Sequence, residues 1–175
     1  MSLSISSPST LQTGADTDVS LTAAQRELWA GHQLDPTRSA FTTAEYVEVA
    51  APVDLDALAA AIHTVIAEAE VLSTRFVAEP DADSADVIQV HDRHHAPELE
   101  RLDLDRAAAV EWMCEDVRRP LDFDTAPLVR TALITAESGA IWYLRAPHAL
   151  LDAYGYSLLT PPCRGAVRGP ARGHR

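Results

Sequence analysis

The residue in this chain best suited to chemistry is His148, which follows an apolar, strand-like run and precedes a segment that contains glycine and serine. Functional side chains gather where strands end and the chain leaves the sheet. A neutral imidazole at such a place can accept a proton from an attacking amine or hydroxyl, or can position that group. Asp152 lies four residues further on. Its carboxylate need not touch a substrate and could instead fix the turn by pairing with an arginine.

Arg130 is the candidate partner for that carboxylate. Three apolar residues share its face of a predicted strand: Leu128, Ala132 and Ile134. A guanidinium on an apolar face is costly without an acid beside it. Asp152 follows the end of the neighbouring strand and could supply the acid. Asp122 and Asp124 are the alternatives. The sequence therefore predicts a site in which His148 does the chemistry while Asp152 and Arg130 hold its turn.

The other histidines and the two cysteines give only weak evidence of a metal site. The polar stretch 91–98 contains three histidines, but their spacing matches no closed metal site, so a solvated loop is the preferred interpretation. His32 and His63 fall among alanines in predicted helices and are interpreted as surface or boundary residues. Cys114 and Cys163 are far apart and lack paired spacing, which favours two ordinary thiols. The sequence thus predicts no metal site.

Composition limits the partners and the location of the protein. The chain has 175 residues and is 47% apolar, which suffices for the core of one domain or a little more. Its 26 acidic and 14 basic residues give a net charge of −12, which disfavours nucleic acid as a partner. No signal peptide opens the chain, and no run approaches the ~20 apolar residues of a membrane span. We therefore expect a soluble, cytoplasmic protein.

Local signals predict four helices and five strands. The helices begin after Thr22, which has Gln25 as a capping-box partner, after Asp54, after Asp105 and near residue 153. The strands are predicted from apolar or alternating runs over residues 41–50, 72–77, 87–90, 128–135 and 140–146. Because strands and helices interleave, we expect an α/β or α+β layered sandwich, with a mixed sheet packed against helices.

The two ends of the chain differ from this pattern. Residues 1–19 are rich in Ser and Thr and are predicted to be a flexible leader. Residues 161–175 contain four arginines, three of them followed by glycine, and no acid. One interpretation of this tail is a short nucleic-acid contact segment. We favour a disordered basic end, with a frame-shifted or truncated reading of a longer gene as one origin, and expect residues 20–160 to form the folded domain.

Several stretches, in order along the chain, resemble the motifs of condensation domains of nonribosomal peptide synthetases. Residues 20–29 are similar to the opening motif of that family. Residues 70–76 are similar to the end of its second motif, Arg-His-Glu-x-Leu-Arg-Thr-x-Phe, in which this chain has Glu68, Ala69 and Ser73 in place of Arg, His and Arg.

The second half of the chain continues the resemblance. Residues 120–123 and 126–130 are similar to the family's Pro-Phe-Asp-Leu and Gly-Pro-Leu-x-Arg segments. Residues 147–153 are similar to His-His-x-x-x-Asp-Gly, with Pro147 in place of the first histidine and Ala153 in place of the glycine. The resemblance covers residues 20–160, which correspond to the N-terminal lobe of a family domain more than twice as long.

The resemblance implies a role for each candidate residue. His148 corresponds to the catalytic histidine, Asp152 to the structural aspartate, and Arg130 to the arginine that pairs with it. It also implies a chloramphenicol acetyltransferase-like fold, in which two α/β lobes form a V and the histidine lies at their junction. This chain would form one of those lobes.

The implied reaction is amide bond formation between a carrier-bound acyl or peptidyl thioester and an aminoacyl amine, as in secondary metabolite and antibiotic biosynthesis. The implied partners are peptidyl or acyl carrier protein domains and a missing C-terminal lobe. No bound cofactor is expected, because each phosphopantetheine arm belongs to its carrier. The alternatives are an ester-forming acyltransferase of the same superfamily and a non-catalytic carrier-docking or scaffold remnant. We expect this chain by itself to be inactive.

Overall fold

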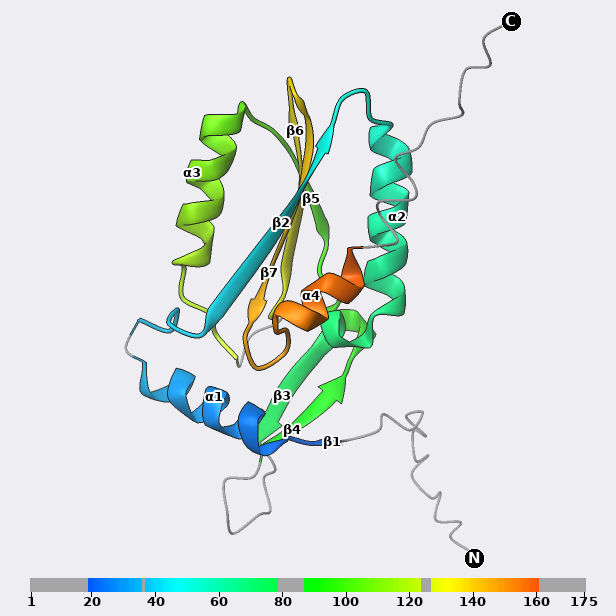
Figure 1. Ribbon diagram of the computed structural model, residues 1–175. Helices are drawn as coiled ribbons and strands as arrows, with labels where there is room; N and C mark the ends of the chain where they lie inside the picture. The colour runs from blue at the N-terminus through cyan, green and yellow to red at the C-terminus, as the bar shows by residue number, and fades with distance from the viewer. Residues whose placement is uncertain (1–18, 36, 79–86, 124–126, 161–175) are drawn as a thin grey trace, which may run out of the picture.

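The computed structural model describes residues 19–35, 37–78, 87–123 and 127–160. The acidic turn at 79–86, Asp124, the basic tail and all but the last residue of the predicted leader lie outside the described residues. Within the described part, helices and strands alternate along the chain and form two sheets (Figure 1). The predicted α/β layered fold is confirmed.

The larger sheet has four strands in the order β2-β7-β6-β5. They are β2 (Thr42–Ala50), β7 (Gly139–Pro147), β6 (Arg130–Ala136) and β5 (Leu99–Asp103). β7 pairs antiparallel with both β2 and β6, whereas β5 pairs parallel with β6. The sheet is therefore mixed, as expected.

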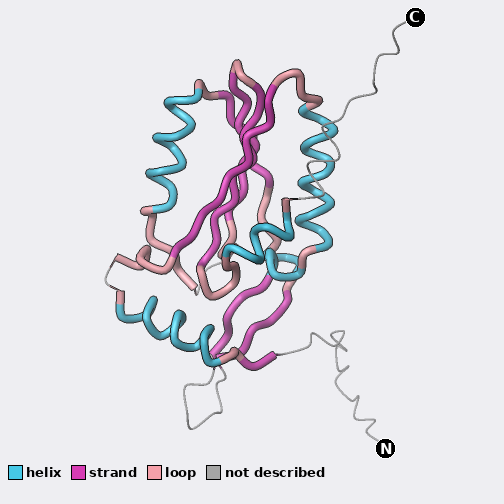
Figure 2. Tube along the Cα trace, in the orientation of Figure 1, coloured by secondary structure: helices cyan, strands magenta, loops and turns pink. Residues whose placement is uncertain are grey.

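Helices cover both faces of this sheet. The helix α3 (Arg106–Val117) lies on one face, and α2 (Leu55–Glu68) and α4 (Ala153–Leu159) lie on the other (Figures 1 and 2). Because β7 is covered on both sides, all nine of its residues are buried, which explains why its sequence is apolar except for Arg145 rather than alternating.

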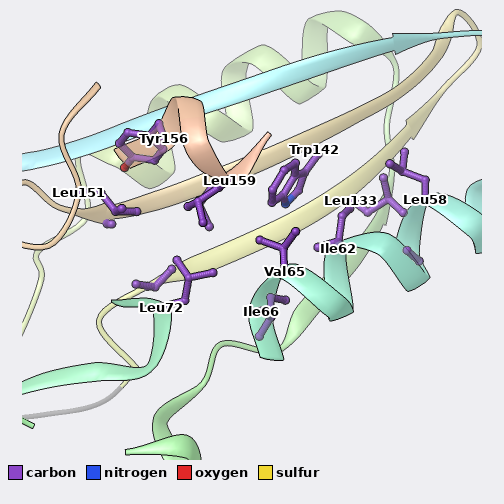
Figure 3. Packing of buried hydrophobic residues seen from close by; sticks show 14 of the residues in the cluster. Leu58, Ile62, Val65, Ile66, Leu72, Leu133, Trp142, Leu151, Tyr156 and Leu159 are labelled. Carbon is purple, nitrogen blue, oxygen red and sulfur yellow. The ribbon is translucent and has the colours of Figure 1, made fainter. Parts of the chain in front are cut away.

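The main core lies between the sheet and α2. The residues Leu58, Ile62 and Val65 of α2 point toward Leu133 and Trp142 of the sheet (Figure 3). The same cluster also includes Leu151 and two residues of α4, Tyr156 and Leu159. Asp54 begins α2 by accepting hydrogen bonds from the amides of Asp56 and Ala57, as its position before the periodic helix predicts.

A smaller sheet and one helix form the other end of the described structure (Figure 1). The smaller sheet has the order β1-β4-β3, with β1 (Val19–Ser20), β4 (Val87–His91) and β3 (Thr74–Ala78) all antiparallel. Beside it lies α1 (Ala23–Leu34), which Thr22 and Gln25 begin with the predicted capping box. Val19 is the last residue of the predicted flexible leader, but in the structure it pairs with Gln89 of β4, so the prediction is wrong at this residue.

The hairpin between β6 and β7 requires a glycine. Gly139 has a φ of 141°, a conformation that side chains with a Cβ rarely adopt. A Cβ at this position would lie 2.0 Å from the carbonyl oxygen of Val49 in β2. The edge strand β2 can therefore approach the turn only because residue 139 has no side chain.

Three local predictions are wrong or incomplete. The predicted strand at 72–77 begins as a 3-10 turn, Glu70–Ser73, and becomes extended only at Thr74. The strand β5 was not predicted. His32, interpreted as a surface or boundary residue, is only 2% exposed, and its Nε2 donates to the carbonyl oxygen of Leu121 at 2.9 Å.

In the described ranges, no helix combines the length and the apolar character needed to cross a membrane.

Candidate functional site

His148 is the first residue after β7, at the end of the strand that is buried throughout. Its backbone N–H donates to the carbonyl oxygen of Phe41 at 2.8 Å. Its Nδ1 lies 3.2 Å from the carbonyl oxygen of Leu151, and because a carbonyl only accepts, Nδ1 carries the proton. In the neutral ring, the lone pair is therefore on Nε2. The residue is exposed to solvent.

The loop that presents His148 is a compact turn. The amides of Leu150 and Leu151 both donate to the carbonyl oxygen of Pro147, at 2.9 and 3.3 Å. Asp152 closes the loop as the N-cap of α4, where its Oδ1 accepts from the amide of Gly155 at 2.7 Å. Ala149 and Leu151 are buried while His148 is exposed, so the loop anchors itself on the core and turns the imidazole outward.

A side-chain contact holds α4 against the edge of the sheet. The hydroxyl of Tyr156 donates to the carbonyl oxygen of Thr43 at 3.0 Å and lies equally close to the hydroxyl of that residue. Burial raises the pKa of Tyr156 to about 12, which keeps the phenol neutral and able to donate. This contact fixes the helix that follows the His148 loop.

A hollow of about 330 Å³ opens beside His148. It is lined by Thr43, Ala44, Glu45, His148, Leu151, Asp152, Ala153 and Tyr156. Glu45 and Asp152 are the acidic residues of this lining, and no arginine belongs to it. A group that carries positive charge, such as a protonated amine, is therefore favoured in the hollow.

Arg130 does not contact Asp152, so the predicted pair is wrong. The Nε and Nη2 of Arg130 donate to the two carboxylate oxygens of Glu100, at 2.5 and 2.8 Å, and its Nη1 donates to Asp116. The reason is the alternation of the strand, which places Arg130 on the face that α3 covers, whereas Asp152 caps α4 on the opposite face. Of the two alternative acids, Asp122 pairs with Arg38 at 3.4 Å, and Asp124 lies outside the described residues.

Asp116 is the centre of a buried polar network under α3. It is fully buried, and its carboxylate also accepts from the hydroxyl of Tyr143 at 3.0 Å and from Arg145 at 3.5 Å. Burial raises the pKa of Tyr143 well above its usual range, so the phenol stays protonated and donates. The guanidinium of Arg130 also lies 4.9 Å from the ring centre of Trp112. The network joins α3 to the sheet on the face opposite α4.

The side chains of the histidine-rich stretch contact neighbouring polar groups. His91 ends β4, and its Nδ1 lies 3.0 Å from the hydroxyl of Ser73. The Nδ1 of His95 lies 2.9 Å from a carboxylate oxygen of Asp92. Among the residues with described positions, no three His, Cys, Asp or Glu side chains gather in a way that could hold a metal ion.

A mixed sheet between helix layers, with an exposed histidine directly after its buried strand, is the arrangement expected from the resemblance to one lobe of a condensation domain. The chain belongs to the condensation domain family, whose model matches residues 15–161. The resemblance seen in the sequence motifs is therefore confirmed.

Two relatives and one solved structure show how this chain compares. It is 38% identical over 142 residues to the isonitrile lipopeptide synthase of Streptomyces coeruleorubidus, covering 79% of this chain and 10% of that protein. It is 36% identical over 152 residues to the dimodular nonribosomal peptide synthase of Bacillus subtilis (strain 168), covering 82% and 6%. The crystal structure of the starter condensation domain of rhizomide synthetase matches with a TM-score of 0.74 and 29% identity, covering 86% of this chain and 37% of that one. The chain thus spans a tenth or less of these curated relatives.

Proposed function

We propose that this chain supplies the histidine-bearing half of a site that joins a carrier-bound acyl or peptidyl thioester to an amine. The observation that carries the proposal is the state of His148. Its Nδ1 is engaged by the carbonyl oxygen of Leu151, its Nε2 has no partner among the described residues, and its ring is exposed beside a hollow. A base held in one tautomer with its lone pair toward solvent suits proton transfer from a nucleophile.

In the proposed reaction, the amine nitrogen attacks the thioester carbonyl while Nε2 of His148 positions the amine or accepts its proton. The C–N bond forms and the C–S bond breaks. The thiolate of the phosphopantetheine arm leaves with its carrier and takes up the proton. The proposal therefore needs two carrier proteins and a second lobe as partners, in the cytoplasm, and no cofactor held by this chain.

The relatives support this substrate class. Both are named as synthases, one of a lipopeptide and one of nonribosomal peptides. A variant of the rhizomide synthetase starter domain was crystallised in complex with C8-CoA and Leu-SNAC, which supports thioester substrates for the site proposed here. The acidic lining of the hollow, from Glu45 and Asp152, favours the binding of an amine, in its protonated form, over that of a neutral hydroxyl. The bound amine must lose that proton before its nitrogen attacks the thioester.

The proposal can be tested in a completed domain. Residues 20–160 would replace the matching lobe in the condensation domain of the isonitrile lipopeptide synthase, and the amide product would be quantified by mass spectrometry with loaded carriers. We expect product formation, reduced roughly 100-fold or more by His148→Ala. The matched control is His63→Ala, which removes an exposed histidine of α2.

Two results would count against catalysis by His148. One is product formation that is the same in the His148→Ala chimera. The other is a chimera that is folded by circular dichroism but makes no product. The second result would favour the carrier-docking remnant, to which the replacements Pro147 and Ala153 also point, and carrier binding by the same chimera would then be measured.

A further inference from the structure

Gln25, in the first turn of α1, makes contacts in two directions with a single amide group. Its Oε1 accepts from the N–H and the hydroxyl of Thr22, at 3.0 and 3.1 Å. Its Nε2 donates to the carbonyl oxygen of Ala149 at 3.1 Å and lies 3.3 Å from the Oε1 of Gln89. The oxygen thus closes the helix cap, and the nitrogen reaches the loop that carries His148.

The cap alone does not require an amide. A capping box works with either Glu or Gln at the third helical position, because only the acceptor oxygen is used. A carboxylate at position 25 could still accept from Thr22, but it could not donate to the carbonyl oxygen of Ala149. The Nε2 contact is therefore a separate contribution of this residue.

Between the two ends of the loop, the described part of the structure shows no other hydrogen bond to a neighbouring element. The described bonds from its backbone ends are those of His148 to Phe41 and of the Asp152 cap to α4. Ala149, between them, is 5% exposed and packs in the cluster that includes Leu21, two residues before α1. The donor from Gln25 therefore restrains the middle of the loop, one residue from the imidazole.

We propose that Gln25 is a positioning residue for His148, acting through the carbonyl oxygen of Ala149. It ties the loop to α1 and, through Gln89, to β4, so the histidine is held by an element that is distant in the sequence. The structural part of the inference stands on these contacts. Its consequence for catalysis rests on the proposed function.

The experiment compares two variants of the full chain that break opposite halves of the contact. Gln25→Glu keeps the acceptor for Thr22 and removes the donor to Ala149. Thr22→Ala removes the cap side chain and leaves the donor in place. Backbone hydrogen exchange by NMR is measured in residues 148–152 and in α1, and the ¹⁵N shifts of the His148 ring report its tautomer.

In Gln25→Glu we expect exchange in residues 148–152 to accelerate roughly three- to tenfold, the range for loss of one hydrogen bond, and the Nδ1–H tautomer of His148 to decrease. In Thr22→Ala we expect faster exchange only in the first turn of α1. Unchanged loop exchange in Gln25→Glu would overturn the inference, and so would equal loop effects in both variants. If Gln25→Glu does not fold, Gln25→Asn, whose shorter side chain cannot span both contacts, is measured instead with the same criteria.

The completed domain provides a second readout. Gln25→Glu should lower kcat several-fold with little change in KM, and it should have no further effect when combined with His148→Ala. Suppose that Gln25→Glu accelerates hydrogen exchange in the loop, while His148→Ala leaves the activity of the completed domain unchanged. This result would support the positioning role and contradict the proposed function. Failure of the positioning role and failure of the proposed function are therefore distinguishable.

Discussion

Arg130 and Asp116 form an ion pair that joins the first residue of β6 to the last turn of α3. Asp116 is completely buried and Arg130 is partly exposed, so the carboxylate depends on the protein for its hydrogen bonds. Arg145, on the neighbouring strand, faces the same carboxylate. The pair is therefore a polar connection between the sheet and the helix on this face, centred on a buried carboxylate.

Replacing Asp116 should be among the most destabilising single changes in the chain. Asp116→Ala leaves the guanidinium of Arg145 and the hydroxyl of Tyr143 buried without this acceptor, and the loss of one partner from a buried pair costs about 3–5 kcal/mol. Urea unfolding measures the change. Glu115→Ala, the adjacent exposed carboxylate on α3, is the control and should change stability little. A cost below about 1 kcal/mol for Asp116→Ala would show that the network is not stabilising.

Arg130 and Asp152 should behave as independent residues. Because Asp152 caps α4 and Arg130 pairs with Glu100 and Asp116, the losses from Arg130→Met and Asp152→Ala should add to within about 0.5 kcal/mol in a double-mutant cycle. Asp152→Ala alone should cost about 1 kcal/mol, as for other N-caps. The comparison cycle, Arg130→Met with Asp116→Ala, should be clearly non-additive. A coupling as large for Asp152 as for Asp116 would contradict the assignment.

The stability of the chain should fall on mild acidification because of His32. Burial lowers the pKa of His32 below its usual value of 6.5, and a protonated ring would place a second N–H at Nδ1, which is buried without a hydrogen-bond partner in the described part. The unfolded chain thus binds the proton more readily than the folded chain. Stability is retained above about pH 6.5 and decreases as the pH falls toward the folded pKa.

His32→Gln should reduce this pH dependence while keeping an N–H donor for the carbonyl oxygen of Leu121. Unfolding midpoints of both proteins between pH 7.5 and pH 5 provide the measurement, with pH values chosen to span the usual titration of histidine, ~6.5. The control, His63→Gln, changes an exposed histidine and should leave the wild-type slope intact. Parallel curves for wild type and His32→Gln would show that another group is responsible.

Glu45 should affect the KM for the amine acceptor in the completed domain. Its carboxylate lines the hollow beside His148, so Glu45→Gln should raise KM for the amine acceptor roughly two- to fivefold, the range for an exposed charge pair, and leave kcat nearly unchanged. The effect should fade at high salt because exposed charges are screened. Glu48→Gln on the same strand is the control, since Glu48 pairs with Arg106 at 2.7 Å and lies on the other face. Equal effects of the two variants would place the amine elsewhere.

Much of the fold could be predicted because its signals are local. Asp54 and the periodic apolar residues after it determine α2 almost to the residue. The strand β5 escaped prediction because Leu99–Asp103 contains three charged residues and lacks strict alternation. Its extended conformation comes from parallel pairing with β6. No local sequence pattern indicates pairing between strands so far apart in the chain.

For the candidate site, the sequence predicts where His148 lies but only some of the contacts around it. The place of His148 after an apolar strand is visible in the sequence, and so is the capping role of Asp152, because it directly precedes a helix. The partners of Arg130 are 30 and 14 residues away, in elements whose packing the sequence did not reveal. A signal for Asp116 does exist: with Ala109 and Met113 it forms a stripe at helical spacing, which predicts burial.

The register of the edge strand has a consequence for biosynthesis. Thr42 at the start of β2 pairs with Pro147 at the end of β7, and β2 has no other strand partner in the described sheet. A ribosome that adds about 5–20 residues per second would need on the order of 5–20 s to make the intervening ~100 residues. During that interval the backbone groups of β2 must remain bonded to water or to other chains. Newly made chains are therefore most vulnerable to aggregation before β7 emerges, and slow translation through that stretch would prolong the risk.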